Sequence, residues 1–176
     1  MSKIAFSKLN LQKASDGIKK IKVNDVEIEV KQYLPINDKL TLISNVINNA
    51  VDQNLPFKNP IKMEVFGALE IAYNYTNITF TDKQKEDPCK LYDLLEINGI
   101  NAAVASAIPE EEYNFLINGI EASMDAFYGY QNSVMGILER VSADYSDLDF
   151  NTMEIQKRIA DPENLTLLKD VMTKLG

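Results

Sequence analysis

Hydrophobic and polar residues follow two different periods along this chain, and the change between them comes early. Between Ile18 and Tyr33, charged and apolar side chains alternate on either side of Asn24-Asp25. A two-residue turn of this kind between alternating runs predicts an antiparallel β-hairpin. The expected partners are Val23 with Val26, Ile21 with Ile28, Lys22 with Glu27, and Lys20 with Glu29.

The predicted hairpin has one apolar face and one face of oppositely charged pairs, as a half-buried pair of strands prefers. A lone hairpin is marginally stable in water and needs a surface to cover. That surface is either the helices that follow or another protein chain, and the alternation does not decide between them. If it is another chain, the partner-binding residues of the hairpin are Val26, Ile28 and Val30.

After Pro35 the apolar residues recur at helical spacing. A first helix is predicted from Asn37 or Asp38 to about Gln53, with an apolar stripe of Leu40, Ile43, Ile47 and Ala50. A second begins at Asn59-Pro60, a capping residue followed by proline, and ends near Asn77. Its expected stripe is Ile61, Val65, Leu69 and Ala72.

Shorter elements are expected next. Thr81 and Gln84 have the spacing of a capping box. Asp87-Pro88 then begins a helix that stops at Gly99, and residues 101–107 add one or two further turns.

The longest predicted helix follows Pro109 and keeps its apolar stripe as far as Val141, about nine turns. Glu110, Glu111 and Glu112 place negative charge in its first turn, where the helix dipole favours it. Three glycines interrupt the stripe, at Gly119, Gly129 and Gly136. We interpret them as small residues at packing contacts, with bends as the alternative.

Two short helices are predicted at the end of the chain, after Asn151 and after Asp161-Pro162. The last has a wide apolar side, so Leu165, Leu168 and Met172 are candidate partner-binding residues. The fold class is therefore mainly α with a small β part (α+β): an N-terminal hairpin followed by a bundle of about five to six helices, one of them long. The expected organisation is a basic arm, 1–17, and one domain, 18–176, with the hairpin at 18–33 and the helical body at 36–175.

Charge is divided unevenly along the chain. The net charge is −8, yet residues 1–22 hold six lysines and one acid, a balance of +5, and the remainder carries −13. An acidic body argues against wrapping nucleic acid, which needs clustered basic residues. The basic arm is either a solvated terminus, a segment that docks on the acidic body of a neighbouring copy, or a contact to a phosphate backbone.

No residue pattern indicates an enzyme. The chain has no histidine, which removes the commonest general base and a common metal ligand. Its single cysteine, Cys89, has no histidine partner and is expected to be inert. Acidic runs such as Asp144, Asp147 and Asp149 lack the glycine and distal glutamate of an EF-hand loop. We therefore expect a non-enzymatic protein without cofactor or metal.

No apolar run approaches the roughly 18 residues that suggest a membrane span, so no membrane partner is expected. The N-terminus has no long apolar segment typical of a secretory signal. One cysteine excludes an internal disulfide framework and fits a reducing compartment. These features indicate a protein of the cell interior.

The order of elements resembles small proteins from the structural gene modules of tailed bacteriophages. The resemblance lies in a leading arm, the hairpin IKVNDVEIEVKQYLP, and helices that begin INDKLTLISNVINNA. The segments FTDKQKEDPCKLYDLL, IPEEEYNFLINGIE and ADPENLTLLKDVMTKLG are also similar to phage proteins. Tail assembly chaperones of phages that infect Gram-positive hosts are similar in size, acidity and layout.

The resemblance implies a binding function in the host cytoplasm during particle assembly. Such a chaperone would bind the long helical tape-measure protein and shield its apolar helix faces. The alternative is a structural virion protein, such as a capsid, neck or tail component. Its arm and hairpin would then contact neighbouring subunits, and a homo-oligomer is expected.

Overall fold

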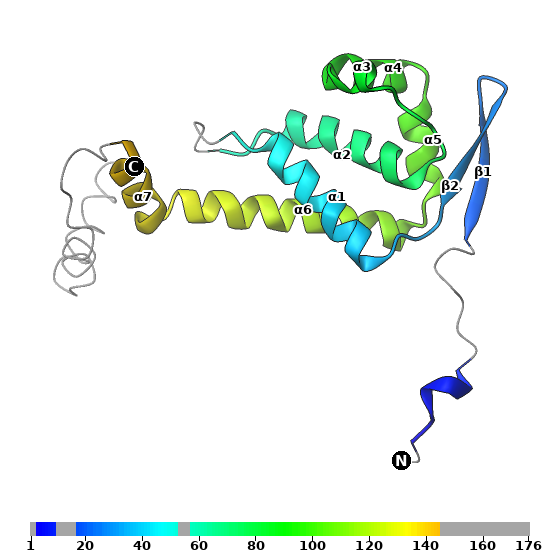
Figure 1. Cartoon of the computed structure of the whole chain (residues 1–176), viewed down its shortest axis with the longest axis horizontal. Helices are drawn as coiled ribbons and strands as arrows, with labels where there is room; N and C mark the ends of the chain where they lie inside the picture. The colour runs from blue at the N-terminus through cyan, green and yellow to red at the C-terminus, as the bar shows by residue number, and fades with distance from the viewer. Residues whose placement is uncertain (1–2, 10–16, 53–56, 145–176) are drawn as a thin grey trace. The chain divides into compact units, whose positions relative to one another are not determined.

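The computed structural model describes residues 3–9, 17–52 and 57–144 of the chain. Most of these residues are helical, and a two-stranded antiparallel hairpin lies near the N-terminus, which confirms the predicted α+β class (Figure 1). The contacts of the chain divide it into two compact units, Met1–Phe127 and Tyr128–Gly176. A 3-10 turn, η1 (Phe6–Lys8), precedes the hairpin.

The hairpin consists of β1 (Ile18–Val23) and β2 (Val26–Lys31), joined in the predicted register. Asn24 and Asp25 form the turn with φ angles of 47° and 64°. Two left-handed residues in succession are typical of the turn whose twist matches paired strands. The other edge of β2 meets the chain after α2, where the Glu29 carbonyl accepts from Asn77 N–H at 3.2 Å.

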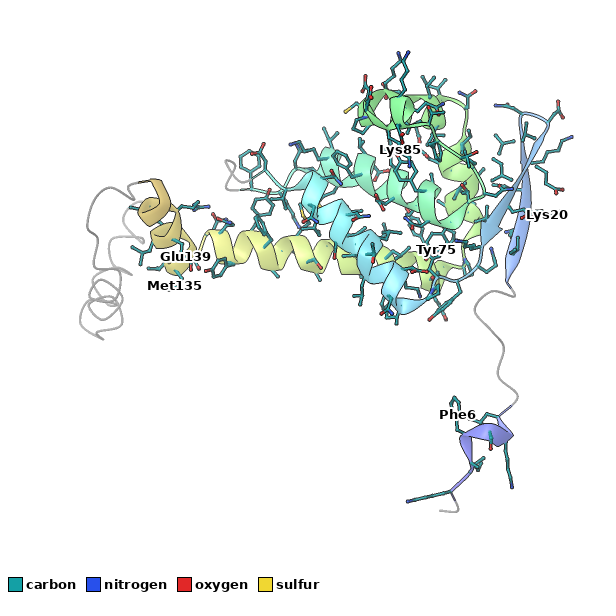
Figure 2. The ribbon with its side chains drawn as sticks, viewed as in Figure 1. Phe6, Lys20, Tyr75, Lys85, Met135 and Glu139 are labelled. Carbon is teal, nitrogen blue, oxygen red and sulfur yellow. The ribbon has the colours of Figure 1, made fainter. Side chains whose placement is uncertain are left out.

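The two faces of the hairpin have different surroundings. On the apolar face, Ile28 and Val30 are buried, and α5 packs against β1. The charged face is exposed, with Lys20 on the side away from the helices (Figure 2). Lys20 Nζ lies 2.7 Å from Glu27 and 3.6 Å from Glu29. Lys22 pairs with Asp25 instead of its cross-strand neighbour, because the turn brings that carboxylate within 2.9 Å.

Helices α1 (Ile36–Ala50) and α2 (Pro60–Tyr75) pack against each other in the first unit (Figure 1). The Asn59 side chain caps α2 as predicted, and it accepts from the N–H groups of Ile61 and Lys62. Two stripe predictions are wrong, since Leu40 and Ile61 are exposed. The buried face of α1 is instead formed by Lys39, Leu42, Ile43, Val46 and Ala50.

Three shorter helices follow, α3 (Asp82–Lys85), α4 (Pro88–Ile97) and α5 (Ile100–Ala107). The predicted capping box at Thr81 and the Asp87 cap of α4 are both present. Gly99 separates α4 from α5 with a φ of 69°, a conformation that glycine adopts without steric cost. A cluster of buried residues joins α2 to α4: Val65, Leu69, Ala72, Leu91 and Leu95.

The long helix begins after Pro109 as predicted, but it does not reach Val141. It ends as α6 (Glu110–Gln131), and α7 (Val134–Asp144) starts anew. Ser133 lies at the interruption and caps α7, because its hydroxyl accepts from Gly136 N–H at 3.1 Å.

The glycines of this region differ in role. A Cβ on Gly119 would lie 2.7 Å from the Ile43 side chain, so this glycine is a packing contact between α6 and α1. A Cβ on Gly136 would overlap the Tyr130 carbonyl oxygen. Gly136 therefore permits the close turn between α6 and α7.

Candidate protein-binding surface

A buried charge cluster joins α1, α2 and α6. Lys39 Nζ lies 2.6 Å from Glu112 Oε2, and Glu112 Oε1 accepts from the Tyr75 hydroxyl at 2.6 Å. The same oxygen accepts from the backbone N–H of Leu34 at 3.0 Å. The exposed fractions are 4% for Lys39, 8% for Glu112 and 0% for Tyr75. Each helix thus contributes one polar group to a cluster whose carboxylate has three donors.

Hydrogen bonding decides the charge state of this cluster. Burial by itself raises the pKa of the Glu112 carboxyl, but the bonds from Lys39, Tyr75 and Leu34 outweigh it and leave the pKa below its usual value. Burial, together with the neighbouring carboxylate, raises the pKa of Tyr75. Glu112 is therefore ionised at neutral pH, and Tyr75 stays protonated as its donor.

Aromatic rings cover the ammonium group of Lys39. Lys39 Nζ lies 3.9 Å from the centre of the Tyr33 ring and 4.9 Å from that of Phe115. A cation over an aromatic face is stabilised by the ring quadrupole. The rings come from the β2–α1 connection and from α6, so the contact also holds these two segments together.

We use the name Lys39 patch for an apolar surface that consists of Tyr33, Ile36, Leu40 and Phe115. Ile36 lies three positions before Lys39, and Leu40 lies four positions after Ile36, so Leu40 is a neighbour of Ile36 on the surface of α1. The exposed fractions are 44% for Tyr33, 51% for Ile36, 55% for Leu40 and 48% for Phe115. Large apolar side chains gathered in this way mark interaction sites on protein surfaces.

The arrangement can bind but offers little for acid–base chemistry. Lys39, Tyr75 and Glu112 are almost completely shielded from water, and each is already engaged with another member of the cluster. A substrate would have to break the cluster to reach them. The buried groups therefore act by fixing the geometry of the apolar surface above them.

The three hairpin residues that were predicted to bind a partner differ in how far they are buried. Ile28 and Val30 lie in the core of the first unit, because the apolar face of the hairpin covers the helices of its own chain. Val26, beside the turn, is 62% exposed, so it alone of the three is placed for contact with another protein. The other candidates, Leu165, Leu168 and Met172, lie outside the described residues.

Other candidate groups have ordinary surroundings. Cys89 is an exposed free thiol in the first turn of α4. Asp147 and Asp149 lie outside the described residues. Within residues 3–9, 17–52 and 57–144, no group of three or more acidic or cysteine side chains is placed to hold a metal ion.

The charge cluster was not expected from the sequence, where Glu112 was interpreted as part of a helix start. A signal was nevertheless present. Lys39 stands at a stripe position, three and four residues before Leu42 and Ile43, and Glu112 stands four residues before Leu116. A lysine and a glutamate in two apolar stripes can be buried if they face each other, which periodicity alone does not reveal.

Comparison with protein-family models, curated proteins and solved structures gives no match to this chain. Among the helices that the structure describes, none is both long and apolar enough to span a membrane.

Proposed function

We propose that this protein is a non-enzymatic protein-binding component of bacteriophage particle assembly, and that it acts as a tail assembly chaperone for the tape-measure protein. The observation that carries the binding role is the Lys39 patch. Four large apolar side chains remain about half exposed there, and the ammonium group of the buried Lys39–Glu112 ion pair lies against the rings of two of them, Tyr33 and Phe115.

The chemistry of the Lys39 patch suits an apolar helix as its partner. Helices are commonly recognised by apolar surfaces that receive side chains spaced by three and four residues. Tyr33 and Phe115 are aromatic, and Ile36 and Leu40 are aliphatic, so the patch has rigid and adaptable parts. A long helical protein such as a tape measure presents many faces of this kind.

The phage assignment comes from the resemblance in layout. An arm, a hairpin and an acidic helical body follow one another in the order expected for these assembly proteins. A chaperone would act in the host cytoplasm and leave before the particle is complete. A structural virion protein of the same layout would remain in the particle, and this difference provides the test.

The experiment compares purified particles with cell extracts from the phage-producing host by mass spectrometry. We expect the protein in the extract, bound to a long helical tape-measure protein, and not in the particles. Recovery of the protein in stoichiometric amounts from particles would contradict the chaperone role and support the structural one.

A matched pair of variants tests the surface. Leu40→Asp places a charge in the Lys39 patch, whereas Ile97→Asp places one at an exposed apolar position of α4. Both should retain the helicity of the wild type by circular dichroism. Only Leu40→Asp should lose the tape-measure protein in a pull-down, and equal binding by both variants would exclude the patch as the site.

A further inference from the structure

A second surface lies along α2, and we call it the α2 groove. It consists of two adjoining hollows of about 240 and 230 Å³. Both hollows are lined by Glu64, Ala68, Ile71 and Tyr113. Residues of α6 complete one hollow, and residues of α4 and α5 complete the other.

Small residues leave room in the α2 groove. Gly67 and Ala68 of α2 line the first hollow, and Ala102 and Ala105 of α5 line the second. A Cβ added to Gly67 would meet no atom within 4 Å. An apolar cavity of about 150 Å³ can hold a benzene ring, so each hollow has room for an aromatic side chain.

The rim of the groove is acidic. Glu64, Glu96 and Glu121 line the two hollows, and no lysine or arginine does. In the described part of the chain, no ion pair engages these three carboxylates. Asn101 adds a buried side-chain oxygen that has no hydrogen-bond donor. An occupant with an apolar anchor flanked by ammonium groups would match this chemistry.

The N-terminal arm of the chain has the complementary chemistry. Residues 1–17 contain Lys3, Lys8 and Lys13 and one acidic residue, Asp16. Among the described apolar side chains of the arm, Ile4 is 72% exposed, Phe6 is 76% exposed and Leu9 is 48% exposed. Figure 2 labels Phe6 on the 3-10 turn. No described residue of the arm lines the α2 groove.

We propose that the α2 groove binds the N-terminal arm of a second copy of this protein. Phe6 enters one of the hollows, and Lys3 and Lys8 lie against the carboxylates of the rim. Each copy carries one arm and one groove, so reciprocal exchange closes a dimer, whereas a one-way exchange extends into a larger assembly. This self-association does not depend on the phage partner proposed above.

Charge reversal in the full-length chain tests the proposal. The arm variant is Lys3→Glu with Lys8→Glu, and the groove variant is Glu64→Lys with Glu121→Lys. The control is Glu86→Lys with Glu111→Lys, two exposed acids that do not line the groove. Sedimentation equilibrium gives the dissociation constant of each, and circular dichroism checks that the helices are retained.

We expect the wild type and the control to associate, with an affinity that falls as salt is added. The arm variant and the groove variant should each associate about tenfold or more weakly. Mixing them in equal amounts should restore association, because each supplies the charge that the other needs. Phe6→Ser should also weaken association.

The proposal is overturned if the wild type stays monomeric, or if its association is indifferent to both charge reversals. It is also overturned if the two variants remain monomeric when mixed. That last outcome would show that the arm of one copy does not pair with the groove of another.

Discussion

Two regions of the first unit contain carboxylates of α6 and its neighbouring helices, and the regions differ in how these carboxylates are paired. Around Glu112, one buried carboxylate receives donors from Lys39, Tyr75 and Leu34. Along the α2 groove, three carboxylates line hollows without a basic side chain. Both regions use residues of α6, one at its first turn and the other along its middle.

The difference separates a stabilising site from a binding site. A buried charge that has its full set of donors favours one arrangement of the helices and offers nothing to a partner. A groove with open volume and carboxylates that lie outside the ion pairs of the described residues contributes little to folding and gains contacts when an occupant arrives. Substitutions around Glu112 should therefore change stability, and substitutions in the groove should change association.

The largest expected effect comes from Lys39→Ala. Removing the ammonium group leaves the Glu112 carboxylate buried without its counter-ion, which costs about 3–5 kcal/mol of unfolding free energy. Urea denaturation followed by circular dichroism measures the change. Lys20→Ala is the control, because its ion pairs are on the exposed face of the hairpin and should contribute almost nothing to stability.

A double variant sharpens this result. Lys39→Met with Glu112→Leu removes both charges together, so no unpaired charge is left in the core. We expect it to be more stable than Lys39→Ala. A double variant as unstable as the single one would show that packing, and not the unpaired carboxylate, causes the loss.

Tyr75→Phe should have an intermediate effect. The substitution keeps the ring and removes one hydrogen bond to an ionised group, which is worth about 1.5–3 kcal/mol. The unfolding free energy should fall by that amount, whereas the self-association constant should stay the same. An altered association constant would show that the cluster and the α2 groove are coupled.

Acid titration should distinguish Glu112 from Glu70. The pKa of Glu112 is lowered in the folded chain, so its contribution to stability is present above the unfolded pKa and is lost as the pH falls below about 4.3. The pKa of Glu70 is raised, first by burial and against hydrogen bonds from Asn45 and Asn74. Its contribution is present below the unfolded pKa and is lost as the pH rises through the folded value.

The two glutamine variants should therefore change the pH dependence in opposite directions. Glu112→Gln should make the unfolding free energy less sensitive to acid. Glu70→Gln should make its fall in acid steeper, because the compensating contribution of Glu70 is removed. Urea denaturation across a pH series checks both, and equal slopes for the two variants would contradict the assignment.

The smallest effect on the fold is expected from Gly67→Ala. Alanine stabilises a helix by roughly 0.5–1 kcal/mol relative to glycine, and the added methyl group meets no atom within 4 Å. The same methyl group occupies part of the α2 groove, so stability should rise while self-association weakens. Gly129→Ala, which also meets no atom, should raise stability and leave association unchanged.

Predictions from the sequence succeeded where the deciding interactions are local. The hairpin register follows from Asn24-Asp25 and four residues on either side. The caps at Asn59, Thr81 and Asp87 involve hydrogen bonds to backbone groups within three residues. Interactions of this range can be predicted from a short stretch of sequence.

Predictions were wrong where a neighbour distant in sequence decides the outcome. Leu40 and Ile61 fit an apolar period, yet no helix covers them in the first unit. One error has a local cause instead: the predicted stripe runs past Gln131 to Val141, but Ser133 caps a new helix, so the stripe is divided into α6 and α7. Periodicity describes which residues share a face and does not say where a helix ends.

The sequence by itself determined the class of the fold, the hairpin and the starts of most helices, because these depend on turns, caps and spacing. Only the tertiary structure decided that Ile28 and Val30 face inward and that Lys39 meets Glu112, residues separated by 73 positions. It also revealed the α2 groove, whose walls come from different helices. The free energy of burying an apolar face or a charge depends on what lies opposite, and packing alone brings those partners together.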